Sequence, residues 1–226
     1  MKKVIVSNKN IGETPLQALE RVRKEEGISA KVPMTYAGRL DPMAEGVLII
    51  LTGEECKKKT EYLVMDKVYE IEVLLGVKTD TQDVLGMING LNLEKIETDV
   101  QKFVGKFDQS YPRYSSKVIA MKEVPEEMPI KQVEIYSIDE LSEREMLGVE
   151  IAGDSIEKIL NVDGEFRQEE IIEEWKAFAV EFENANFKIV RLRVKCSSGT
   201  YMRTLAEKMG GLAYSIKRVS VGEFKN

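Results

Sequence analysis

The chain has 226 residues, of which 43% are hydrophobic and 32% charged, and its net charge is −6. This composition excludes an intrinsically disordered chain and a small disulfide scaffold, and the length suggests one large domain, with or without a sizeable insertion. The sequence contains no histidine, which excludes catalytic triads and metal sites that depend on imidazole. The negative charge argues mildly against a nucleic-acid partner, unless a local basic surface compensates for it.

The amino-terminal sequence MKKVIVSNKN lacks the apolar core of a secretory signal, and the apolar run at residues 47–51 is too short to span a bilayer. We therefore expect a cytoplasmic protein with no membrane partner. Cys56 and Cys196 have no CxxC partner, which favours reduced, buried thiols over a metal site or a disulfide.

Residues 4–6 are expected to form a short strand that leads into a helix. Thr14 has the character of an N-cap, and Gln17 stands where a capping box needs it. Pro15 suits the first helical position, and Gly27 marks the end of the helix.

The stretch TYAGRLDPMAEGVLIILTG, residues 35–53, places Asp41 in a turn before an apolar strand. An aspartate in such a turn can hydrogen-bond its own backbone, or it can be held rigidly for chemistry. Residues 54–63 are expected to form a second helix that carries Lys57, Lys58 and Lys59. These lysines indicate a solvated helix face or a contact to phosphate.

The sequence DKVYEIEVLLG alternates as a strand whose inward face includes Tyr69. Asp80 and Asp83 follow in a short loop between glycines, which is interpreted as a turn because it lacks the length of a calcium loop. Residues 96–104 have helical spacing, and the segment at residues 111–114 contains a proline that favours an edge strand or irregular structure.

From about residue 142 to residue 176 the composition becomes acidic and helical, which predicts a helical insertion packed on the core. Residues 190–196 then form a strand with one apolar and one basic face. Arg203 lies in the first turn of the following helix, where the helix dipole disfavours a cation. A carboxylate close to Arg203 would resolve this conflict.

Four motifs in this order resemble the bacterial TruB family of tRNA pseudouridine synthases. They are GRLDPMAEGVLIILTGEECK, DKVYEIEVLLGVKTDTQDVLG, CSSGTYMRTLAEKMG and AYSIKRVSVGEF. The resemblance covers most of the chain and implies one catalytic domain over residues 1–226, including the insertion. It implies an α/β (α+β) fold with a central, mostly antiparallel mixed sheet, flanking helices and an active cleft across the sheet.

The resemblance also implies roles for individual residues. Asp41 corresponds to the catalytic aspartate, Tyr69 to a ring that packs on the target base, and Arg203 to the cation paired with Asp41. Ile216 corresponds to an apolar wall, and Tyr36 stands where the family usually has a histidine that stacks in the T-loop.

The implied reaction is isomerisation of the T-loop uridine of tRNA, position 55, to pseudouridine. The implied partner is the T-arm of tRNA, and we expect a monomer that needs neither a metal nor an organic cofactor. On the basic strand face and near the last strand, phosphate contacts or simple solvation are both open for Arg191, Arg193, Lys217 and Arg218.

Three departures from the family limit what is carried over. Tyr36 replaces the usual histidine, the segment after Lys117 is short, and the acidic insertion has no clear counterpart. We also expect no separate carboxy-terminal RNA-binding domain. Alternatives are a pseudouridine synthase for ribosomal RNA, because GRLD also resembles that class, and an RNA-binding protein without turnover.

Overall fold

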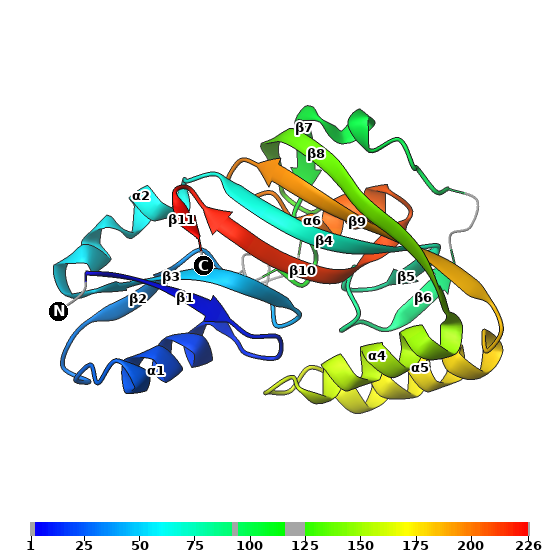
Figure 1. Cartoon of the computed structure of the whole chain (residues 1–226), viewed down its shortest axis with the longest axis horizontal. Coiled ribbons are helices and arrows are strands. Elements are labelled where there is room, and N and C mark those ends of the chain that lie inside the picture. The colour runs from blue at the N-terminus through cyan, green and yellow to red at the C-terminus, as the bar shows by residue number, and fades with distance from the viewer. Residues whose placement is uncertain (1–2, 92–94, 116–124, 226) are drawn as a thin grey trace.

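The computed structural model describes residues 3–91, 95–115 and 125–225. Within them, a nine-stranded sheet has the order β1-β3-β10-β4-β9-β8-β7, with β2 paired to β3 and β11 paired to β10 (Figure 1). Its strands are β1 (Val4–Lys9), β2 (Met34–Ala37), β3 (Ala44–Thr52), β4 (Lys67–Leu75), β7 (Gly105–Ser110), β8 (Ile130–Leu147), β9 (Asn186–Cys196), β10 (Gly211–Val221) and β11 (Phe224–Lys225). β3 and β10 pair in parallel, and the other pairs are antiparallel. The predicted fold class is confirmed.

Helices cover both faces of this sheet. The helical elements are α1 (Pro15–Glu25), η1 (Gly53–Lys58), α2 (Lys59–Leu63), η2 (Val100–Phe103), α4 (Gly148–Leu160), α5 (Gln168–Glu181) and α6 (Met202–Lys208). A separate two-stranded sheet is formed by β5 (Val77–Thr79) and β6 (Ile88–Leu91).

Two apolar cores show which helices lie on which face. The side chains of α6 cluster with Ile71 and Val73 of β4, whereas those of the α4–α5 hairpin cluster with Leu74. Because successive side chains of a strand point to opposite faces, α6 and the α4–α5 hairpin lie on opposite faces of the sheet. Figure 1 shows the hairpin lying along the lower side of the sheet, beside the end of β8.

The structure confirms the local signals at the first two helices. Thr14 caps α1: its hydroxyl accepts a hydrogen bond from the backbone of Gln17, and the Gln17 side chain accepts one from the backbone of Thr14. The chain leaves α1 through Gly27, whose φ is +61°. Residues 53–63 are helical as predicted, with a 3-10 helix in the first half.

Two predictions need correction. Residues 96–104 form only the single 3-10 turn η2, because Ile96 and Val104 are each 39% exposed and contribute no continuous buried face. Residues 142–147 extend β8 and pair with β9, so the helical part of the acidic insertion is Gly148–Glu181. The segment after Lys117, predicted to be short, falls largely on residues 116–124, outside the described residues.

Candidate active site

Asp41 lies in the turn between β2 and β3, and the turn is fixed against β10. The backbone N–H of Ala44 donates to the carbonyl of Asp41 at 3.0 Å. Two residues into β3, Gly46 has a φ of +108°, and a Cβ there would lie 2.2 Å from the carbonyl oxygen of Arg218. Glycine is therefore required where β3 and β10 approach each other. This close approach fixes the position of β3, and with it the Asp41 turn that precedes it.

Lys9, the last residue of β1, also supports this turn. Its side chain is fully buried, and its ammonium donates to the carbonyls of Ala44 at 2.6 Å, Asn10 at 2.8 Å and Pro42 at 3.3 Å. Burial lowers the pKa of Lys9 to about 8. Two of these charge-assisted hydrogen bonds, to Pro42 and Ala44, hold the turn in one conformation, and the third connects it to the segment after β1.

Arg203, the second residue of α6, has the acidic neighbour that its position requires. Its Nε lies 2.9 Å from Oδ2 of Asp41 and 3.8 Å from Oδ2 of Asp83, and its Nη1 donates to the carbonyl of Thr81 at 2.7 Å. Arg203 is 3% exposed and Asp83 is 4% exposed. One buried guanidinium thus lies between two carboxylates.

The charges of this cluster support one another. Burial would lower the pKa of Arg203, but the carboxylates of Asp41 and Asp83 outweigh it, so the pKa lies above its usual value. Burial raises the pKa of Asp83, and Arg203 opposes this rise. Asp83 also accepts hydrogen bonds from the Thr81 hydroxyl at 2.8 Å and the Leu85 backbone at 3.0 Å.

Asp41 and Arg203 open onto a cavity of about 700 Å³. Tyr69, Ile216 and Tyr36, the other residues expected at the site, also line it. Burial raises the pKa of the Tyr69 hydroxyl, so the ring presents a neutral aromatic surface. Among the described lining residues, Asp41 is the one acidic side chain and six are basic. The basic residues are Arg39, Lys59, Lys67, Lys131, Arg203 and Arg218.

Arg218, predicted as a possible phosphate contact, has a different place. It is 1% exposed and donates to the carbonyls of Val47 at 2.7 Å, Arg39 at 3.2 Å and Gly38 at 3.3 Å. Its guanidinium is therefore occupied by the backbone around the Asp41 turn, and the prediction of a surface contact is corrected.

Arg191, Arg193 and Lys217 are exposed but lie away from the cavity. Arg191 and Arg193 both bind Glu70, at 2.6 and 2.7 Å, and Lys217 lies 3.8 Å from Glu45. Glu70 is next to Tyr69 in β4, so it points to the opposite face of the sheet. The structure does not bring these three cations to the site.

Sequence reasoning missed three residues of this region. Asp83 was interpreted as part of a turn, and nothing local distinguishes it. Lys67 is 5% exposed, lines the cavity, and has its pKa lowered to about 8 by burial. Lys9 carried a usable signal, because in strand β1 it shares the inward parity of Ile5.

Among the described residues, no group of three or more acidic or cysteine side chains is arranged to hold a metal ion. In the same residues, no helix is long and apolar enough to cross a membrane. Cys56 and Cys196 are free thiols. Cys196 is buried as predicted, whereas Cys56 is partly exposed, which corrects the prediction that both are buried.

Comparison with known proteins shows the family to which this chain belongs. Residues 28–152 match the model of the TruB family pseudouridylate synthase (N terminal domain). The chain belongs to the TruB family. It is 28% identical over 229 residues to a tRNA pseudouridine synthase B from Nostoc sp., covering 95% of this chain and 64% of that protein. It is also 28% identical over 221 residues to a tRNA pseudouridine synthase B from Endomicrobium trichonymphae, covering 92% of this chain and 77% of that protein.

This TruB family chain therefore spans less than two thirds of the Nostoc relative. Its fold resembles the crystal structure of a Cbf5-Nop10-Gar1 complex, with a TM-score of 0.60 at 18% identity over 99% of this chain and 50% of that one. Asp41 and Tyr69 fall inside the matched family model, whereas Arg203 and Ile216 follow it.

Proposed function

We propose that the chain isomerises uridine to pseudouridine in tRNA, and that its target is the T-loop uridine at position 55. The observation that carries the proposal is the pair of Asp41 and Arg203, 2.9 Å apart, at the wall of a cavity that also holds Tyr69 and Ile216. The name tRNA pseudouridine synthase B, borne by relatives that match more than nine tenths of this chain, supports the same activity.

The proposed reaction breaks the N1–C1′ bond of the nucleotide and forms a C5–C1′ bond after the uracil has turned. The proton on C5 is lost and N1 gains one, so atoms and electrons balance without a redox step or water. The carboxylate of Asp41 acts on the nucleotide, as a nucleophile or as a base towards the ribose. Arg203 holds this carboxylate in one orientation through a charge-assisted contact at 2.9 Å.

The cavity walls have the properties that a freed base requires. Tyr69 presents its ring to one side of the base, and Ile216 forms an apolar wall. A uridine reaches such a site only after it leaves its stack. Three cations in the cavity lining would contact the RNA phosphates next to the target uridine. They are Arg39, Lys59 and Lys131. Tyr36, whose ring has Lys59 Nζ 5.2 Å from its centroid, would stack on a neighbouring base.

The test is to incubate the purified protein with an unmodified tRNA transcript and to map pseudouridine by carbodiimide labelling and primer extension. The wild-type protein should produce one stop at the T-loop uridine. Asp41→Asn should abolish it while leaving tRNA binding nearly unchanged, because the substitution removes the charge and keeps the shape. Asp108→Asn, the same change on the exposed strand β7, is the matched control and should remain active.

The same assay with ribosomal RNA separates the alternatives. Modification of ribosomal RNA alone would show that the substrate assignment is wrong. A wild-type protein that binds tRNA and modifies neither RNA would indicate an RNA-binding protein without turnover.

A further inference from the structure

The α4–α5 hairpin contacts the loop that carries Asp83. Trp175, which is fully buried in α5, donates its indole N–H to the carbonyl of Val84 at 3.1 Å. Val84 is also fully buried and directly follows Asp83 in the chain. The one tryptophan of the sequence thus hydrogen-bonds the residue next to Asp83, whose carboxylate faces Arg203.

A second contact holds the same loop from the beginning of α5. Arg167 lies 2.9 Å from the carboxylate of Asp80, and its own backbone has a φ of +62°. The Tyr114 hydroxyl reaches the same carboxylate oxygen at 3.3 Å. The loop of residues 80–85 is therefore held by the hairpin at both of its ends.

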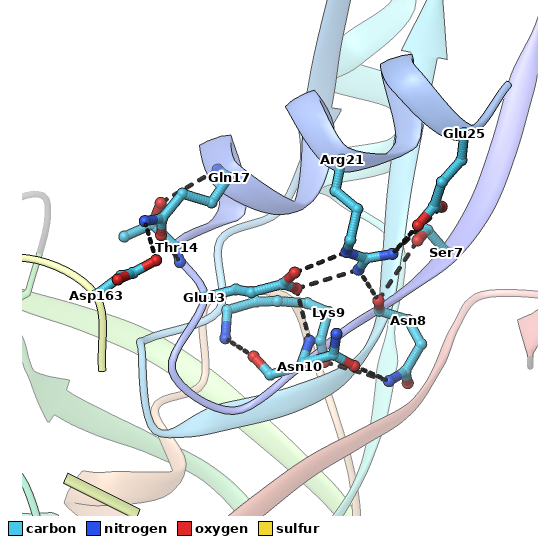
Figure 2. Close-up of polar contacts among 10 residues, drawn as sticks. All are labelled: Ser7, Asn8, Lys9, Asn10, Glu13, Thr14, Gln17, Arg21, Glu25 and Asp163. Carbon is cyan, nitrogen blue, oxygen red and sulfur yellow. Dashed lines mark hydrogen bonds and ion pairs between the residues drawn. The ribbon is translucent and has the colours of Figure 1, made fainter. Parts of the chain in front are cut away.

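The connection between α4 and α5 contacts the other side of the site. The backbone N–H of Asp163 donates to the carbonyl of Gly12 at 3.3 Å, and the N–H of Gly12 donates to the carbonyl of Pro42 at 2.9 Å. Pro42 directly follows Asp41. Figure 2 shows Asp163 reaching the beginning of α1, where Gln17 Nε2 donates to its carboxylate at 3.2 Å.

The fit at this contact leaves no room for a side chain on Gly12. The residue has a φ of +88°, and a Cβ there would lie 2.0 Å from the carbonyl oxygen of Asn161. The backbone of the hairpin is therefore packed directly against the segment that supports Pro42.

We propose that the α4–α5 hairpin is a brace that positions Asp41 and Asp83 on the two sides of Arg203, with Trp175 as the positioning residue on the Asp83 side. The brace lies on the sheet face opposite the cavity, and among the described residues none of the hairpin's is part of the cavity lining. Productive geometry tolerates displacements of only about 0.5 Å, so loops that carry such groups need a supporting shell. The α4–α5 hairpin supplies such support to the Asp41 turn and to the Asp83 loop.

The test compares Trp175→Phe with Phe178→Leu. The first keeps a buried aromatic ring but removes the donor to Val84. The second removes aromatic packing three residues further along α5, where the ring of Phe178 contacts Trp175, Phe182 and Phe187, with ring centroids 5.4, 4.8 and 5.2 Å apart. It leaves the Trp175 donor to Val84 in place. Hydrogen–deuterium exchange of residues 79–87 is measured in both, under conditions where both are folded.

Trp175→Phe should speed exchange in residues 79–87 by about tenfold, the effect of losing one buried hydrogen bond. Phe178→Leu should leave these residues near the wild-type rate. In single-turnover assays with the tRNA transcript, Trp175→Phe should lower the rate constant by about tenfold and change the Kd for tRNA by less than about twofold, since Trp175 is not among the cavity-lining residues. Phe178→Leu should leave both the rate constant and the Kd for tRNA near their wild-type values.

Equal exchange in the two variants, or equal losses of rate, would overturn the proposal, because the hairpin would then be acting through general stability alone. The activity readout rests on the proposed function, but the exchange readout does not. If the wild-type protein makes no pseudouridine, the proposed function fails and the exchange comparison still decides whether the brace exists.

Discussion

Replacing Arg203 by methionine tests the central feature of the site, a buried cation between two carboxylates. Methionine keeps an unbranched side chain in the same space and removes the charge. The side chain of Asp83 is only 6% exposed, and its oxygen lies 3.8 Å from Arg203 Nε. At an effective dielectric constant of about 20, that separation corresponds to an attraction of about 4 kcal/mol.

Removing one partner of a buried ion pair costs about 3–5 kcal/mol, because the other charge stays buried and unpaired. We therefore expect Arg203→Met to lower the free energy of unfolding by about 3–5 kcal/mol at pH 7. In an Asp83→Asn background the same change should cost about 2 kcal/mol less, since the amide needs no counterion. Asp41 adds little to this difference, because its side chain is 33% exposed and water screens it.

The pH dependence gives a second measure of the same pair. Burial raises the pKa of Asp83 and Arg203 opposes that rise, so the pKa rises further when Arg203 is absent. A carboxyl with a raised pKa in the folded state stabilises the fold at low pH, and the contribution is lost as the pH rises through that pKa. Arg203→Met should therefore recover part of its lost stability between pH 7 and pH 5, relative to the wild type.

Urea denaturation of the wild type, the two single variants and the double variant, at pH 7 and pH 5, measures both effects. A coupling energy below about 0.5 kcal/mol, the usual error of additivity, would refute the reasoning. So would a loss of stability in Arg203→Met that is the same at both pH values.

Two further predictions concern buried titratable groups. Because burial lowers the pKa of Lys9 to about 8, the unfolded chain binds a proton at this residue that the folded chain releases, so Lys9 should add about 3 kcal/mol of stability between about pH 8 and pH 10.5. Denaturant titrations should show that Lys9→Met loses this contribution and keeps the similar one from Lys67, whose pKa is also lowered to about 8; a pH profile identical to that of the wild type would contradict the assignment to Lys9. Burial also raises the pKa of Cys196 to about 12, so at pH 8 the native protein should react with a thiol reagent only at Cys56, and both thiols should react after denaturation. Rapid modification of Cys196 in the native protein would contradict the structure.

The parts of the fold that the sequence predicts well are those determined by local chemistry. The capping box at Thr14 and Gln17 involves neighbours in the chain, and the alternation in residues 67–75 and 190–196 follows from the period of a strand. The four family motifs added the identity of Asp41, Tyr69 and Arg203, which no local rule provides. Their meeting in one cavity agrees with the expectation, and their roles stay proposals.

The parts that the sequence did not predict depend on contacts between distant segments. Asp83 is important because α6 brings Arg203 to it across 120 residues, and a turn residue carries no sign of this partner. In β10, Lys217 and Arg218 are adjacent and must point to opposite faces. Sequence parity shows that they differ, but not that the cavity lies on the Arg218 side and that backbone carbonyls occupy its guanidinium.

The two misassigned segments were each decided by their surroundings in the fold, which the local sequence does not show. Residues 96–104 have helical spacing, but Ile96 and Val104 are each 39% exposed, and spacing with so little burial stabilises little helix. In residues 142–147 the high charge suggested a helix. There the charges are paired across the sheet instead, with Glu143 bound to Lys188 at 3.1 Å, which lets a charged sequence extend β8.

The placement of charge answers the objection that an acidic chain should not bind RNA. Six cations and one carboxylate line the cavity, while Glu169, Glu170 and Glu173 are exposed on α5, on a hairpin that packs on the opposite face of the sheet. The net charge of −6 is thus compatible with a local field that attracts phosphates at the cavity and repels them at the hairpin. An RNA bound as proposed would be steered to the face that carries Asp41, and the acidic brace would stay free of it.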